Sequence, residues 1–136
     1  MIRPEYKEIV KKEVNLKTFV YRGFNCKIIR VRPEVSGRLC GYIEIPESHE
    51  LHNMEYDEIE EKYNYELPAH GGLTFSGKFN SGGYWIGFDC AHSGDLSPCY
   101  SPDFDFGINH YDRYMDMHSV EVCINEIVDF IKEEQK

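Results

Sequence analysis

The chain has 136 residues, a formal net charge of −9, 41% hydrophobic residues and 14% aromatic residues. Its length and apolar content predict one domain with a core of its own and exclude an intrinsically disordered chain. Its negative charge argues against direct binding to nucleic acid or to an anionic membrane, since both need a basic face.

The N-terminus and the cysteines predict where the protein acts. The first residues carry charges and lack the apolar core of an export signal, and no stretch approaches the roughly 18 apolar residues that span a membrane. Five cysteines are scattered singly, without a C-x-x-C pair. This usage is typical of reduced thiols in a cytoplasm rather than of a disulfide framework.

The first part of the chain predicts a short helix and three strands. A proline suits the first turn of the helix, and apolar residues recur along one of its sides. Three runs rich in β-branched and aromatic residues, separated by turn residues, predict the strands. The helix is expected over Pro4 to Val14, and the strands over Thr18 to Tyr21, Phe24 to Arg32 and Leu39 to Ile45.

Two polar features here each allow two interpretations. Arg30 and Arg32 point the same way along a strand, and they form either an anion contact or a pair of surface arginines. The acidic segment from Glu47 to Glu66 begins with His49 and His52. It is either a metal-binding cluster or a surface loop with a helical turn near residues 57–62.

The stretch from His70 to Asp95 is the most distinctive part of the chain, because it holds seven of the eleven glycines and the single tryptophan. It predicts a β-hairpin with strands over Leu73 to Gly77 and Tyr84 to Cys90. We expect Thr74 to lie opposite Gly87. This register gathers the apolar side chains on one face of the hairpin: Leu73, Phe75, Ile86 and Phe88.

The same register predicts a polar site at one end of the hairpin. The polar face would carry His70, Thr74, Ser76, Trp85 and Asp89. His70 enters the first strand where the chain leaves the second. We therefore expect four side chains to converge there: His70, Asp89, His92 and Asp95.

The end of the chain predicts a loop from Leu96 to Asn109 and then an amphipathic helix with Ser119 as its cap. Apolar residues recur in this helix at helical spacing: Val120, Cys123, Ile124, Ile127, Val128 and Ile131. Strands gathered centrally, without regular alternation with helices, favour a single α+β domain over residues 1–136. Its mostly antiparallel sheet of about four to six strands would carry the short N-terminal helix and, packed on it, the C-terminal helix.

These motifs resemble a small-protein family of bacteriophages and prophages. The matching pieces are Cys40-Gly41-Tyr42-Ile43, Pro46 with His49, His70 to Phe75, and Trp85 to Asp95. Two departures are visible: only Ile86 separates Trp85 from Gly87, where the family has two residues, and Glu50 replaces a proline. The resemblance covers roughly Phe24 to Asp95. It implies a phage accessory protein that acts in the cytoplasm of the bacterial host, where such proteins often counter defence.

The first functional hypothesis is a protein that sequesters a nucleotide-derived immune signal. Trp85, Tyr84 or Phe75 would stack on a base, and glycine N–H groups at residues 71, 72 and 94 would hold phosphate. A basic residue would have to reach in from elsewhere in the chain or from a second subunit of a homo-oligomer; Arg30, Arg113 and Lys78 are candidates. The predicted ligand-binding residues are His70, Gly71, Gly72, Thr74, Ser76, Trp85, Asp89, His92, Asp95 and Arg113.

Three alternatives stay open. A small hydrolase of a nucleotide-type substrate would use His70, Asp89 and His92 as catalytic candidates, with or without a divalent metal. No other cofactor is expected. An acidic inhibitor would instead bind a host defence protein through the carboxylates of residues 47–66. Finally, the polar groups of the hairpin could simply hydrogen-bond one another and hold its end together.

Overall fold

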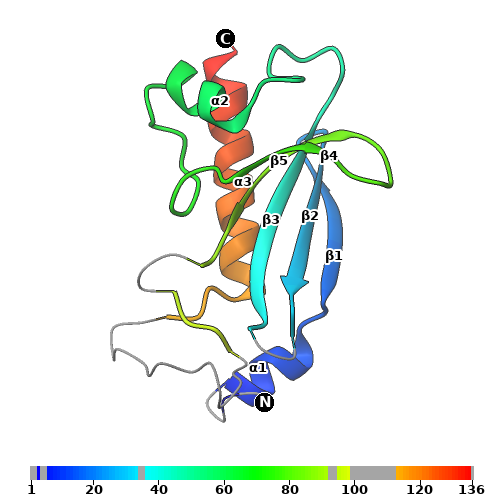
Figure 1. The fold of residues 1–136 in the computed structure, drawn as a ribbon, viewed down its shortest axis with the longest axis vertical. Helices are drawn as coiled ribbons and strands as arrows, with labels where there is room; N and C mark the ends of the chain where they lie inside the picture. The colour runs from blue at the N-terminus through cyan, green and yellow to red at the C-terminus, as the bar shows by residue number, and fades with distance from the viewer. Residues whose placement is uncertain (1–2, 4–5, 34–35, 92–94, 99–112, 136) are drawn as a thin grey trace.

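The structure is a computed structural model, and it describes residues 3, 6–33, 36–91, 95–98 and 113–135. Three helices and five strands follow one another along the chain (Figure 1). They are α1 (Lys7–Lys12), β1 (Leu16–Tyr21), β2 (Phe24–Val31), β3 (Arg38–Ile45), α2 (Tyr56–Lys62), β4 (Phe75–Lys78), β5 (Tyr84–Asp89) and α3 (Met117–Glu134). The predicted single α+β domain is confirmed.

The five strands form one antiparallel sheet in the order β1-β2-β3-β5-β4. Figure 1 shows α3 lying along one face of this sheet, with α2 beside its C-terminal end and α1 at the opposite end of the molecule. None of the helices in the described residues is both long and apolar enough to cross a bilayer.

The core lies between the sheet and α3. The six apolar residues that the sequence predicts for the helix stripe are all buried, and Met117 joins them. Opposite them, buried residues of β2 and β3 alternate with half-buried or exposed ones, as expected for a sheet with one face against a helix. Asp116, rather than the predicted Ser119, caps the helix: its Oδ1 accepts a hydrogen bond from the Ser119 N–H at 2.8 Å.

Arg30 belongs to this core, so it is not a surface arginine, and the anion that it contacts is a carboxylate of the chain itself. Its side chain is 0% exposed, and its Nη2 lies 2.8 Å from Glu13 Oε1. Nη1 donates to the Gly37 carbonyl at 2.7 Å and to the Tyr114 hydroxyl at 2.9 Å. Glu13 also accepts from the Met117 N–H at 2.7 Å. This buried network ties the segment after α1 to β2 and to the start of α3.

The register of the β4–β5 hairpin is one residue away from the prediction, because Phe75, not Thr74, lies opposite Gly87. Phe75 therefore shares the outer face of the sheet with Trp85 and Gly87, away from α3. On this face Phe79 stacks on Trp85 with ring centroids 5.2 Å apart, and Phe75 meets Tyr42 edge to face at 5.5 Å. An aromatic outer face stabilises the observed register, which the apolar alternation alone did not reveal.

Candidate functional site

The structure brings His70 and Asp95 together, as the hairpin prediction expects. His70 Nε2 lies 2.7 Å from Asp95 Oδ1 and 2.9 Å from Oδ2. The side chain of His70 is 30% exposed, whereas that of Asp95 is only 5% exposed. Since a carboxylate only accepts hydrogen bonds, this contact places a proton on Nε2 and fixes the orientation of the ring.

Backbone contacts hold Asp95 in place from two directions. Asp95 forms a parallel bridge with Arg113, and the Leu96 N–H donates to the Arg113 carbonyl at 2.8 Å. On another side, Arg38 Nη2 lies 3.3 Å from the Asp95 carbonyl oxygen. Arg38 Nε is buried and has no hydrogen-bond partner in the described part of the chain. These contacts join the backbone of Asp95 to the Arg38 side chain and to the Arg113 backbone, and they position the residue that supports His70.

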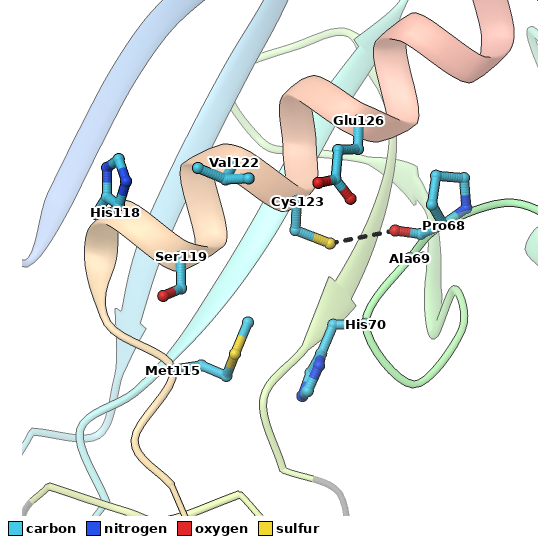
Figure 2. Close-up of a pocket in the computed structure, with 9 residues that line it drawn as sticks. All are labelled: Pro68, Ala69, His70, Met115, His118, Ser119, Val122, Cys123 and Glu126. Atoms are coloured by element: carbon cyan, nitrogen blue, oxygen red, sulfur yellow. Dashed lines mark hydrogen bonds between the residues drawn. The ribbon is translucent and has the colours of Figure 1, made fainter.

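A hollow of about 490 Å³ opens beside His70; we refer to it as the His70 pocket. Figure 2 shows that one wall comes from the segment before the hairpin and the other from the beginning of α3. The lining combines apolar surface with a few polar groups: Pro68, Ala69, His70, Met115, His118, Ser119, Val122, Cys123 and Glu126.

Cys123 belongs to the pocket wall but does not suit the role of a nucleophile. Its Sγ donates a hydrogen bond to the Pro68 carbonyl at 3.4 Å, which joins the two walls (Figure 2). Burial raises the pKa of the Cys123 thiol, so the thiol form is favoured at neutral pH. The side chain therefore packs and positions the wall.

The glycines next to His70 make a turn. Gly71 and Gly72 have φ angles of 70° and 89°, in the left-handed region that favours glycine. The Gly72 N–H donates to the Ala69 carbonyl at 2.9 Å. Because this donor is used within the turn, the prediction that Gly72 holds phosphate is wrong. Gly94 lies outside the described residues.

Glu60 reaches this turn from α2. Its carboxylate accepts a hydrogen bond from the Leu73 N–H, but Oε1 is buried and has no hydrogen-bond partner among the described residues. Burial raises the pKa of the Glu60 carboxyl above its ordinary value of 4.5. The Glu60 carboxyl therefore binds a proton more readily in the folded state than in the unfolded chain. At neutral pH the ionised carboxylate lowers the free energy of unfolding.

We expect Glu60→Gln to raise the free energy of unfolding at pH 7 by up to about 1 kcal/mol, because it removes the charge and leaves an acceptor for the Leu73 N–H. As the pH falls through the raised pKa toward 4.5, wild-type Glu60 becomes protonated and the difference should shrink. Urea unfolding at pH 7 and pH 4 tests this. A gain that is equal at both pH values would contradict the assignment.

Three other predicted residues lie away from the His70 pocket. Trp85 is only 6% exposed, and its Nε1 donates to the Gly82 carbonyl at 3.0 Å on the outer face of the sheet. Ser76 accepts from the Tyr56 N–H and donates to Glu55 Oε2, which joins β4 to the start of α2. The side chain of Thr74 is exposed. The predicted single site is therefore divided between two faces of the sheet.

Asp89, at the end of β5, accepts a hydrogen bond on Oδ1 from the Ala91 N–H at 3.1 Å. This contact stabilises the end of the strand. His92 lies outside the described residues. Within the described residues, no three His, Cys, Asp or Glu side chains are grouped closely enough to bind a metal, including His49 and His52 of the acidic segment.

The α3 wall and Arg38 are functional candidates that the sequence reasoning missed. His118, Val122 and Glu126 recur at intervals of four, which is the signal of a shared helix face, beside the buried stripe. Two of the three basic residues expected to reach the site are elsewhere: Arg30 is in the buried network, and Lys78 is at the far end of β4.

No family model matches the chain, and neither the curated proteins nor the solved structures include one that is significantly similar to it. The resemblance to phage proteins therefore stays a prediction that rests on its motifs.

Proposed function

We propose that the protein binds a small nucleotide-derived ligand in the His70 pocket and so sequesters a host immune signal during phage infection. The observation that carries this proposal is the buried Asp95 carboxylate, which holds a half-buried imidazole at the edge of the pocket. The pocket volume of about 490 Å³ falls within the range of small-molecule sites.

The pocket offers a partner for each part of a nucleotide. Asp95 orients the His70 ring, and this ring can meet a phosphate oxygen. Ser119 and Glu126 offer a hydroxyl and a carboxylate for ribose hydroxyls, and Met115 and Val122 offer apolar surface for a base. Stacking on Trp85 has no part in this arrangement, because that ring packs on Phe79 on the other face.

Positive charge near Asp95 supports the binding of an anionic group. Arg38 has a buried Nε with no partner in the described part of the chain, and the Arg113 backbone runs beside Asp95. In a chain with a net charge of −9, the Arg38 guanidinium beside the Asp95 backbone reduces the electrostatic cost of bringing in a phosphate.

The test blocks the pocket without disturbing the core. The purified protein is incubated with cyclic dinucleotides and with ADP-ribose-type signals, the free nucleotides are quantified by chromatography, and the protein is then denatured and the measurement repeated. Wild type should deplete one class of nucleotide and return it unchanged. Val122→Trp, which adds bulk at an exposed position of the wall, should weaken binding by at least about tenfold, or roughly 1.4 kcal/mol.

Ile9→Trp is the matched control, because it places the same side chain at an exposed apolar position on α1, outside the pocket. It should bind like wild type. Equal depletion by Val122→Trp would place the ligand elsewhere, and no depletion of either class by the wild-type protein would contradict the proposal.

A hydrolase is the second candidate, and the His70–Asp95 pair is the observation that favours it, since an imidazole that is oriented by a carboxylate is a common general base. In the same experiment this activity would appear as a new product peak. Asp95→Asn should then slow product formation more than it weakens binding.

The glutamates at the start of α2 give the acidic-inhibitor alternative less support than the His70 pocket gives the first two candidates. Glu55 and Glu58 form the capping box at the start of this helix, and Glu55 also accepts from Ser76. Part of the acidic charge therefore has a structural role.

A further inference from the structure

The two edges of the sheet differ in how they are covered. At the β4 edge, Ser76 hydrogen-bonds to the Tyr56 N–H and to Glu55, so the start of α2 lies against this strand. At the other edge, no described strand or helix pairs with the far side of β1 (Figure 1). An open edge strand is a template for pairing with another chain.

The hydrogen bonds to β2 identify which groups of β1 point outward. The Arg30 N–H donates to the Asn15 carbonyl at 2.8 Å, so residues 15 and 30 form a hydrogen-bonded pair. Such pairs alternate along an antiparallel ladder, so Lys17, Phe19 and Tyr21 bond toward β2. The N–H and C=O groups of the intervening residues point away from the sheet: Leu16, Thr18 and Val20.

This outward edge is complementary to itself. If two β1 strands pair antiparallel about Thr18, every outward N–H and C=O group finds a partner, because Thr18 meets its own copy and Leu16 meets Val20. Leu16 and Val20 are 56% and 66% exposed in the single chain. The same pairing places Leu16 of each copy against Val20 of the other copy, so two aliphatic contacts form.

Charges along β1 do not oppose this pairing. Lys17 is bonded to Glu121 at 2.6 Å, and Arg22, just after the strand, is bonded to Asp129 at 2.8 Å. In the proposed register Lys17 lies across from Phe19 of the other copy. Within one chain, Lys17 Nζ already lies 5.8 Å from the centroid of the Phe19 ring. The pairing would add a second cation–π contact of the same kind, with the Phe19 ring of the other copy.

We propose that the protein self-associates as a two-fold symmetric dimer through β1, with two five-stranded sheets joined into one continuous sheet. A second copy of the same edge provides hydrogen-bond partners for the outward backbone groups and apolar contacts for the exposed side chains. β1 has no proline and only one charged residue, so it lacks the usual features that prevent an edge strand from pairing. The interface is a single strand, so the dimer is weak and forms as the concentration rises. No residue of β1 lines the His70 pocket.

Sedimentation velocity over a wide concentration range tests the dimer with the full chain. Thr18→Pro removes an outward N–H that no β1–β2 bond uses, and Val20→Lys places a charge at the seam. Wild type and the control Thr18→Ala should show a dimer fraction that rises with concentration. Both seam variants should stay monomeric, with at least about tenfold weaker association.

Circular dichroism shows whether the seam variants remain folded, and Val20→Lys, at a position that is 66% exposed, provides the result if Thr18→Pro unfolds. A wild-type protein that is monomeric at every concentration would overturn the proposal. So would a folded Val20→Lys variant that associates like wild type. Ligand binding by the monomeric variants is independent of this outcome.

Discussion

Replacing Glu13 with alanine should lower the free energy of unfolding by about 3–5 kcal/mol, because it leaves the Arg30 guanidinium buried without its counter-ion. The Arg30 side chain is 0% exposed, so water cannot replace the lost carboxylate without a change in packing. The substitution also removes the acceptor of the Tyr114 hydroxyl at 2.6 Å and of the Met117 N–H at 2.7 Å. Three segments of the chain would lose a shared partner at once.

Urea unfolding at neutral pH measures this effect. Glu8→Ala is the control, since it removes an exposed carboxylate from α1, and it should change stability by less than about 0.5 kcal/mol. Combining Glu13→Ala with Arg30→Met should recover part of the loss, because the uncompensated charge is removed as well. Equal stability of the Glu13 and Glu8 variants would refute the structural role of the network.

Gly87→Ala is expected to have the second largest effect, with a loss of at least about 1–3 kcal/mol in unfolding free energy. Gly87 lies opposite Tyr42 in the β3–β5 ladder. A Cβ atom at this position would lie 2.7 Å from the Gly41 carbonyl oxygen and closer still to the edge of the Tyr42 ring. The backbone of β3 cannot move without disturbing the centre of the sheet.

A rescue experiment separates the two clashes of the Gly87 variant. Adding Tyr42→Ala should relieve the clash with the ring but not the one with the Gly41 carbonyl, so only part of the stability should return. Urea unfolding of the two single variants and of the double variant provides the comparison. Additive losses, without any rescue, would show that the ring does not restrict this position.

The local elements could be predicted because their signals are local. Periodic apolar residues identify the stripe of α3, and the turn at Arg22-Gly23 separates β1 from β2 where the sequence predicts it. The cap of α3 was predicted three residues late. Met117 and His118, the first two residues of the helix, do not follow the later apolar spacing clearly, so the pattern did not reveal where the helix begins. The side chain of Asp116 accepts from the Ser119 N–H, as an N-cap does.

The candidate site was predicted only in part, because its two halves depend on different information. His70 and Asp95 meet because they flank the hairpin, and their proximity does not depend on the face that each strand residue takes. The register of the hairpin, in contrast, does depend on which face each strand residue takes. Tyr42, Phe75 and Trp85 make the outer face aromatic, so the alternation of apolar residues could not distinguish the two faces. The α3 wall depends on how a distant helix packs, which no local pattern encodes.

The partners of the N-terminal segment have a consequence for protein synthesis. Glu13 bonds to Tyr114 and Met117, Lys17 to Glu121, and Tyr21 to Asp129, across 101 to 108 positions of sequence. A ribosome releases the N-terminal segment long before it makes these partners. The growing chain therefore exposes β1 and a charged Arg30 until α3 emerges, and the domain closes as one unit only after α3 has been translated.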